Sequence, residues 1–279
     1  MSIKGLFREY MTVSPLLMKV FVQNKSGSAR FVKEAYHYGP DKQQDVLIIH
    51  PEEGQRKSTT LFFCHGGGWR QGTPQTFRFV AYFFASLGYT TILAGYRKAP
   101  KHVFPAQTDD VANALKFGVD KLKEQGLYQD KVVLMGQSAG AHIVTYLAYS
   151  DVLPKIGFDK KAIKGVMSIS GPINFKECRN GYLTRAINDF IGKEGHKEKA
   201  DPYQWLNADV NIPILCIHGD CDSVVEPANS ISFVSKINEI SPGLGKLIII
   251  KGGLHSNLAK LFWKGMAEHA DMCEWIDSI

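Results

Sequence analysis

Short apolar runs rich in β-branched residues alternate along the chain with segments of helical periodicity. Because the runs are continuously apolar, we expect strands buried on both faces of a mostly parallel sheet that helices flank. The pattern therefore predicts an α/β fold. The predicted strands are Val46–His50, Leu61–His65, Thr90–Ala94, Lys131–Met135, Gly165–Ser170, Pro213–His218 and Lys246–Ile250.

Apolar residues at helical spacing between these strands predict the covering helices. The run Phe77–Leu87 follows Thr73-Pro74, a capping residue and a proline at the expected first helical position. Gly88 is expected to end that helix. The other helical segments are Val111–Leu122, Ala141–Tyr149 and Leu258–Trp275.

One segment interrupts this alternation and sets the expected domain organisation. Residues 171–209 are rich in loops and lysine, and they predict a small cap insertion in a single domain of residues 1–279. Residues 1–40 match no motif and are interpreted as an N-terminal extension. Its helix either packs against the domain or contributes to the cap, with an apolar face of Leu6, Phe7, Tyr10 and Met11.

Composition and charge narrow the class of protein. The 279 residues are 44% hydrophobic and 22% charged, which excludes a disordered or collagenous chain. The net charge of +6 is too small to indicate nucleic-acid binding. The segment Lys155–Lys199 holds ten Lys/Arg and five Asp/Glu, a local +5. Either this is a solvated surface of the insertion, or the insertion favours anionic substrates.

The cysteines and the apolar runs bear on cellular location. No apolar run has the ~18 residues that span a bilayer, and charged residues interrupt the N-terminus where a signal peptide needs an apolar core. The expected location is therefore the cytoplasm, where thiols stay reduced. The cysteines are odd in number and form no CxxC pair, so neither a disulfide framework nor a zinc site is predicted; they are Cys64, Cys178, Cys216, Cys221 and Cys273.

The sequence Gly136-Gln137-Ser138-Ala139-Gly140 lies between a predicted strand and a predicted helix. In this context a G-x-S-x-G motif presents a nucleophile on a sharp turn. The backbone of the nucleophile is strained there, and side chains two residues away on either side would clash, which explains both glycines. The helix N-terminus also favours negative charge developing near the serine. We predict Ser138 as a nucleophile.

A serine hydroxyl needs a base, which a carboxylate must orient. In a sheet of this kind the partners follow later strands, the acid before the histidine. Asp222 and His255 lie on glycine-containing loops just past the last two predicted strands. We therefore predict His255 as the base and Asp222 as its orienting acid.

Other residues compete for these two roles. Asp220 and Glu226 flank Asp222, and Asp220 is the alternative acid. His142 follows Ser138 on the same helix, where we expect a packed side chain, and His218 lies within its strand and is expected in the core. Next to the motifs, Cys64 and Cys221 are interpreted as small buried residues, whereas an exposed Cys221 would make the protein sensitive to thiol reagents.

A second glycine-rich motif, His65-Gly66-Gly67-Gly68-Trp69, follows the strand Leu61–His65. Glycines let backbone N–H groups converge on one point. We predict that Gly67 and Gly68, joined by the N–H of Ala139, form an oxyanion hole. His65, Trp69 and Gln137 are expected to contact the substrate.

These motifs together resemble the α/β-hydrolase superfamily, and within it the hormone-sensitive-lipase-like and carboxylesterase group. The stretch Gly95-Tyr96-Arg97-Lys98-Ala99-Pro100, with Phe104-Pro105 and Asp109-Asp110, resembles a structural segment of that group. The resemblance implies that the arginine and the later aspartate tie a strand end to the next helix. Gly95 stands where the group usually has aspartate. The GQSAGAH sequence is also similar to small esterases of the kynurenine formamidase and isoprenylcysteine methylesterase type.

The resemblance implies a serine hydrolase that needs no cofactor or metal and cleaves small-acyl carboxylic esters through an acyl-enzyme. Ser138, His255 and Asp222 would be its catalytic residues, and the expected partner is a small-molecule ester. Three alternatives stay open: an arylformamidase acting on N-formylkynurenine-type substrates, a deacetylase of acetylated sugars, and a non-catalytic binding protein on a hydrolase scaffold. Neither acyl-chain length nor oligomeric state is predicted.

Overall fold

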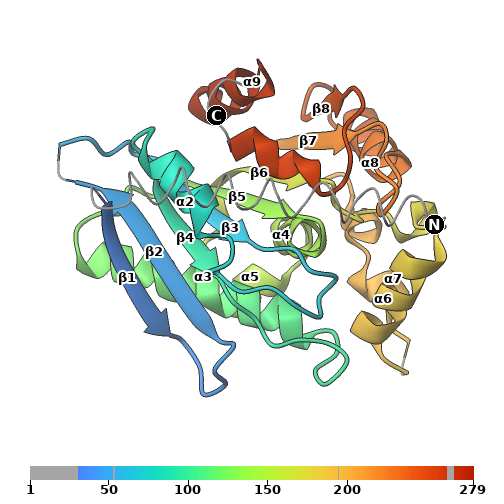
Figure 1. Ribbon diagram of the computed structural model, residues 1–279, viewed down its shortest axis with the longest axis horizontal. Helices are drawn as coiled ribbons and strands as arrows, with labels where there is room; N and C mark the ends of the chain where they lie inside the picture. The colour runs from blue at the N-terminus through green and yellow to red at the C-terminus, as the bar shows by residue number, and fades with distance from the viewer. Residues whose placement is uncertain (1–30, 53, 194, 263–266) are drawn as a thin grey trace.

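A twisted sheet of eight strands forms the centre of the molecule (Figure 1). The computed structural model describes residues 31–279 except 53, 194 and 263–266. The strand order is β1-β2-β4-β3-β5-β6-β7-β8; β2 pairs antiparallel with β1 and β4, and every later pair is parallel. The strands are β1 (Phe31–His37), β2 (Asp45–Pro51), β3 (Thr60–Cys64), β4 (Thr90–Ala94), β5 (Val132–Gln137), β6 (Ile163–Ile169), β7 (Ile214–Gly219) and β8 (Gly245–Ile250).

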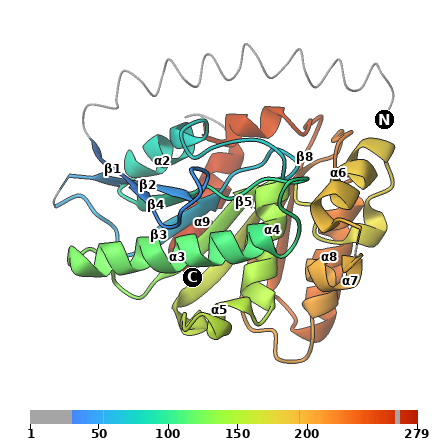
Figure 2. The ribbon, with the colours of Figure 1, turned by 90° about the horizontal axis from the view of Figure 1, so that it is seen from below.

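Successive side chains of the central strands point to opposite sides of the sheet. Helices cover each side, so both faces are buried. In β2, Val46 and Ile48 join one apolar cluster, whereas Leu47 and Ile49 join the other. Figure 2 shows the helices in two layers. One face is covered by α3 (Ala106–Glu124), α4 (Ala139–Tyr149) and α8 (Ala228–Ile240), and the other by α2 (Arg78–Ala85), η5 (Asn257–Phe262) and α9 (Ala267–Ser278).

All seven predicted strands are confirmed as β2 to β8. The sequence analysis missed β1, since this edge strand carries charged residues such as Lys33 and Glu34 and is only partly buried. Residues 31–37 of the expected N-terminal extension therefore belong to the sheet and not to a cap. The predicted N-terminal helix, with Leu6, Phe7, Tyr10 and Met11, lies outside the described residues.

Two helix predictions need correction. The helix after β3 begins at Arg78 and not at Pro74, because Thr73 and Pro74 form a separate turn in which the Thr73 hydroxyl accepts the N–H of Thr76 at 3.2 Å. The segment predicted as a single last helix divides into η5 and α9. The remaining helices, including α3 and α4, cover the predicted segments.

The insertion, residues 171–209, follows β6 and precedes β7, and it lies at one end of the molecule in both views (Figures 1 and 2). Its longest helix, α6, begins where the side chain of Asn180 accepts the N–H of Leu183 at 2.8 Å. Asp201 accepts the N–H groups of Phe175 and Tyr203 and so joins the two ends of the insertion. Its elements are η3 (Phe175–Glu177), α6 (Gly181–Ile191), α7 (Lys197–Ala200) and η4 (Pro202–Trp205), and two short elements, α5 (Val152–Lys155) and η2 (Lys160–Ala162), precede β6.

The structural tie implied by the Gly95–Asp110 segment is present. Arg97 donates two guanidinium hydrogen bonds to Asp110, of 2.9 and 2.8 Å, and its backbone N–H donates a third of 2.9 Å. These bonds fasten the chain after β4 to the N-terminal part of α3. Gly95 accepts no side chain, because a Cβ there would lie 1.9 Å from a carboxylate oxygen of Asp45.

None of the helices within the described ranges combines the length and the apolar character that crossing a lipid bilayer requires.

Candidate active site

Ser138 occupies a sharp turn between β5 and α4. Its backbone adopts φ 55° and ψ −123°, a conformation that residues with a side chain rarely take. The predicted clashes at the flanking glycines are confirmed: a Cβ on Gly136 would lie 2.4 Å from the backbone of Gly140. A Cβ on Gly140 would lie 2.0 Å from the carbonyl oxygen of Cys64. The turn therefore depends on both glycines.

The structure brings Ser138, His255 and Asp222 together from three separate loops. The Oγ of Ser138 lies 2.9 Å from Nε2 of His255, and Nδ1 of His255 lies 2.8 Å from Oδ2 of Asp222. An ionised carboxylate can only accept, so Nδ1 carries the proton of the neutral ring. Nε2 is then the acceptor that faces the serine hydroxyl, as a general base requires.

The carboxylate of Asp222 is fully buried and held on both oxygens. Oδ1 accepts the backbone N–H groups of Val224 and Val225, each at 2.9 Å, while Oδ2 faces His255. Burial alone would raise the pKa of Asp222, but His255 and the hydrogen bonds it receives outweigh burial and hold that pKa well below its usual range. Asp222 is therefore ionised throughout the neutral pH range.

The competing acids are engaged elsewhere. Asp220 accepts the N–H of Gly252 and so links the loops after β7 and β8. Glu226 accepts the N–H of Asn180 at 2.8 Å and so anchors the start of α6. Nδ1 of His255 faces Asp222.

The glycine loop lies beside Ser138. Gly67 and Gly68 adopt φ values of 118° and 59°, and Trp69 follows at 58°. This run of left-handed conformations lets the loop turn back under the cavity. In the described ranges, the N–H groups of Gly67 and Gly68 meet no protein acceptor, and Ala139 contributes the first N–H of α4. All three residues line the same cavity as Ser138.

A buried hydrogen-bond chain connects this loop to α4 and to the insertion. His142 of α4 is fully buried, and burial lowers its pKa to about 3, so the ring is neutral. Its Nε2 donates to the carbonyl oxygen of Ala200 at 2.8 Å, because that oxygen can only accept. Nδ1 then accepts the indole N–H of Trp69 at 3.3 Å. His142 is thus the packed residue that the sequence predicts.

The residues predicted to contact substrate divide into two groups. Trp69 and Gln137 line the cavity, and Nε2 of Gln137 lies 3.5 Å from Nε2 of His255. His65 does not line it. Its buried ring stacks on Tyr96, donates from Nδ1 to the carbonyl of Gly66 at 2.7 Å, and accepts from Lys98 at 3.2 Å. The structure therefore places His65 beneath the glycine loop and away from the substrate space.

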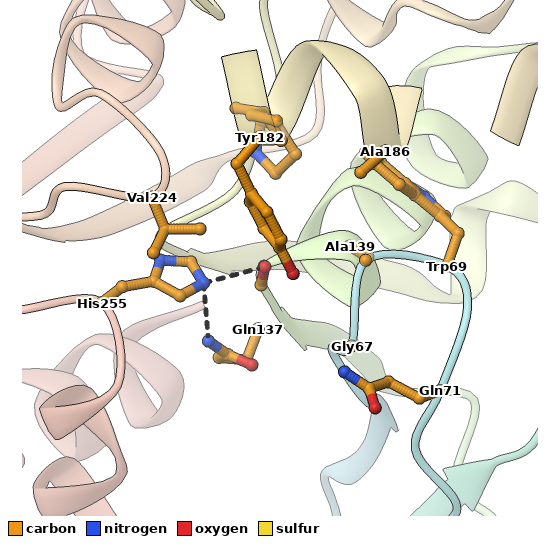
Figure 3. A pocket seen from close by; sticks show the side chains of 13 residues that line it. Gly67, Trp69, Gln71, Gln137, Ala139, Tyr182, Ala186, Val224 and His255 are labelled. Carbon is orange, nitrogen blue, oxygen red and sulfur yellow. Dashed lines mark hydrogen bonds between the residues drawn. The ribbon is translucent and has the colours of Figure 1, made fainter. Parts of the chain in front are cut away.

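The cavity above Ser138 has a volume of about 400 Å³. In Figure 3, Val224 and His255 stand on one side and Gly67 and Gln71 on the other, with Tyr182 reaching in from α6. Sequence reasoning missed these wall residues. The helical spacing of apolar residues in the insertion could have indicated the α6 side chains, whereas no signal marks a loop residue. The missed residues are Gln71, Pro172, Tyr182, Leu183, Ala186 and Val224.

The two thiols beside the site differ in exposure. Cys64 is buried, and burial raises its pKa to about 12, which makes it unreactive at neutral pH. Cys221 is exposed on the loop that carries Asp222. The expectation of a buried Cys221 was therefore wrong.

The mostly parallel sheet, its two helical layers and the serine on the turn after β5 define an α/β hydrolase. Residues 46–237 match the family model described as BD-FAE, which is more than half of the chain. The protein belongs to the BD-FAE family.

Similar proteins carry esterase names. The chain is 24% identical over 219 residues to esterase LipQ of Mycobacterium tuberculosis (strain ATCC 25618 / H37Rv), covering 72% of this chain and 52% of that protein. It is 22% identical to a probable isoprenylcysteine alpha-carbonyl methylesterase of Arabidopsis thaliana, covering 81% and 58% respectively. The chain thus spans about half the length of the curated relatives it matches.

A solved esterase shares the fold. The hyperthermophilic esterase from the archaeon Pyrobaculum calidifontis superimposes with a TM-score of 0.74 at 18% identity, covering 97% of this chain and 93% of that one.

Proposed function

We propose that the protein is a serine esterase in which Ser138 attacks the ester, His255 acts as base and Asp222 orients His255. The observation that carries this proposal is the continuous chain of hydrogen bonds, 2.9 Å from Ser138 to His255 and 2.8 Å from His255 to Asp222. It ends at a cavity beside backbone N–H groups of Gly67 and Gly68 that have no acceptor within the described part of the chain. The family membership and the esterase names of the relatives support the same activity.

The reaction would proceed through an acyl-enzyme. Ser138 Oγ bonds to the ester carbonyl carbon while its proton passes to Nε2 of His255. The negative charge on the former carbonyl oxygen would be stabilised by the N–H groups of Gly67, Gly68 and Ala139. The protonated His255 then gives its proton to the departing alcohol. Water, deprotonated by the same nitrogen, releases the acid and restores Ser138.

The lining of the cavity favours neutral substrates. Among the described residues around it, His255 is the one titratable side chain apart from the phenol of Tyr182, and the walls are apolar or amide. Part of the positive charge of the basic segment lies away from Ser138. Lys155 is in α5, Lys160 is in η2 and Lys164 is in β6, near the start of that strand and opposite the strand ends that carry Ser138. We therefore favour a solvated basic surface over an anionic-substrate site. A cavity of about 400 Å³ suits esters with short acyl groups.

Mutation of the nucleophile tests the proposal. Ser138→Ala should abolish hydrolysis of p-nitrophenyl acetate and butyrate. Ser86→Ala should retain it, because Ser86 lies on the surface, where its hydroxyl donates to the carbonyl oxygen of Phe83. Activity should survive EDTA. A fluorophosphonate probe should label the wild type and not S138A. Substantial turnover by S138A would contradict the assignment.

A substrate panel separates the remaining alternatives. N-formylkynurenine hydrolysis faster than ester hydrolysis would make the protein an arylformamidase, and preference for acetylated sugars would make it a deacetylase. A protein that neither hydrolyses esters nor accepts the fluorophosphonate would be the non-catalytic binding protein. We expect short acyl esters to give the highest kcat/KM.

A further inference from the structure

A second histidine lies against the carboxylate of Asp222, at the same oxygen that faces His255. Nε2 of His218, in β7, stands 3.3 Å from Oδ2 of Asp222 and 3.0 Å from the carbonyl oxygen of Val225. Nδ1 of the same ring lies 2.7 Å from the hydroxyl of Ser230 in α8. The side chains of His218 and Asp222 are both completely buried. The oxygen that faces His255 is therefore shared between two imidazoles.

These contacts determine the proton position on His218. The carbonyl of Val225 can only accept, and the ionised Asp222 can only accept, so Nε2 must carry a proton. Nδ1 of the neutral ring then accepts, and the hydroxyl of Ser230 supplies that hydrogen bond. Each polar atom of the ring is satisfied by a buried partner. The arrangement fixes the ring with its N–H shared between the carbonyl oxygen of Val225 and Oδ2 of Asp222.

The ionisable groups around this pair come from three elements. His218 approaches Asp222 from β7, and His255 approaches it from the loop after β8. Cys216, also in β7, interacts with the hydroxyl of Ser230. Glu226 lies on the same loop as Asp222, but one of its carboxylate oxygens accepts the N–H of Asn180. His218 and His255 are thus the two groups that share the charge of Asp222.

We propose that His218 is a positioning residue for the esterase reaction, which holds Asp222 and takes part of its negative charge. The inference rests on the proposed function. Together with the N–H groups of Val224 and Val225 on Oδ1, the N–H of His218 limits movement of the carboxylate and so keeps Oδ2 aligned with Nδ1 of His255. It also draws charge away from Oδ2, so the protonated form of His255 is stabilised less than by an unshared carboxylate. His218 thereby acts on the base through Asp222 and without touching substrate.

Two substitutions at one position separate this role from mere packing. In His218→Gln the side-chain N–H₂ reaches about as far as Nε2 and can still donate to Asp222. In His218→Asn the shorter amide reaches only as far as Nδ1. We expect H218N to lower kcat/KM about 10- to 100-fold, as for loss of a hydrogen bond to a charged group. In the plot of kcat/KM against pH, the midpoint of the acid limb should rise by about 0.5–1 pH unit. H218Q should stay within about threefold of wild type with an unmoved limb.

The control is Ile217→Val, which trims a buried neighbour on the opposite face of β7 and should leave the pH profile unchanged. Equal impairment of H218Q and H218N with unmoved limbs would mean that His218 only packs, and would overturn the proposal. So would a wild-type rate and profile in H218N. If S138A also remained active, the proposed function itself would fail, which is a separate outcome.

A measurement on the wild-type protein keeps the inference testable even if both variants fail to fold. Nitrogen NMR of ¹⁵N-histidine-labelled protein reads which ring nitrogen carries the proton. We expect the His218 signals to show protonated Nε2 and unprotonated Nδ1 at neutral pH. The opposite tautomer would leave Nε2 with nothing to donate to Asp222, and the proposal would be wrong.

Discussion

The carboxyl edge of the sheet and the insertion contribute to one cavity in different ways. At the sheet edge every group of the proposed triad is buried or nearly so and held by a short hydrogen bond, as with Asp222. The insertion supplies apolar side chains from α6, and its Tyr182 is 41% exposed. Under the proposed function, reactivity and substrate choice are therefore carried by separate segments. Substitutions in one should leave the other largely intact.

The largest effect is expected where the sheet edge is broken directly. Asp222→Asn should lower kcat about 10³- to 10⁴-fold, because an amide stabilises the wrong tautomer of His255 and cannot offset its positive charge. Steady-state hydrolysis of p-nitrophenyl butyrate measures the loss. The matched variant Asp220→Asn, on the same loop, should lose no more than about tenfold. A comparable loss in both would point to loop structure and not to the role of Asp222.

A smaller effect is expected where the two regions join. His142→Leu leaves the indole N–H of Trp69 and the carbonyl of Ala200 buried without partners, which should cost about 2 kcal/mol of unfolding free energy. The glycine loop loses a support, so kcat should fall about tenfold while KM changes little. Denaturant unfolding and kinetics measure the two effects. Trp69→Phe removes the same N–H together with part of the indole ring, and it should also lower both quantities.

Substrate choice should change when the insertion alone is altered. Leu183→Ala enlarges the cavity, so the ratio of kcat/KM for octanoate to that for acetate should rise about tenfold. Ile187→Ala is the control, because this buried residue of α6 does not line the cavity. Both variants lose packing, but only the first should change the ratio. An unchanged ratio in Leu183→Ala would mean that acyl chains occupy another part of the cavity.

The smallest effect on activity is expected where a substitution changes only the stability of the insertion. Burial raises the pKa of Asp201 to about 6, although the N–H groups of Tyr203 and Phe175 favour its charged form. Since that pKa exceeds the unfolded value, Asp201 costs stability as the pH rises from about 4 to 6. The side chain in Asp201→Asn cannot ionise. The free energy of unfolding of this variant minus that of the wild type should therefore rise by about 2 kcal/mol between pH 4 and 7. Thermal unfolding at several pH values tests this, with the exposed Asp209→Asn as the control expected to show no such trend.

The sequence predicted those parts of the molecule in which local pattern and tertiary role coincide. Strands β2 to β8 are continuously apolar because both faces of the sheet are covered, and the turn around Ser138 needs glycine at fixed spacing. Asp222 and His255 could be selected because parallel strands end at the same edge. The predicted grouping of both residues with Ser138 corresponds to two contacts, 2.9 Å from Ser138 to His255 and 2.8 Å from His255 to Asp222.

The sequence could not predict features that depend on the packing of distant segments. The helix α6 reaches the cavity only because the insertion folds back over the strand ends, so Leu183 and Tyr182 carry no local mark of their role. His65 belongs to the glycine motif, yet its ring turns under the loop to meet Lys98. His218 reads as an ordinary core residue, since its partner Ser230 comes from the following helix.

The backbone conformation at Ser138 makes activity and stability favour different residues at this position. Its φ of 55° is one that glycine adopts freely and serine does not. Ser138→Gly should therefore raise the free energy of unfolding by about 1 kcal/mol and abolish hydrolysis. A library of this chain screened for thermal resistance alone would enrich dead variants at position 138. Any search for a more durable form must therefore score turnover in the same round.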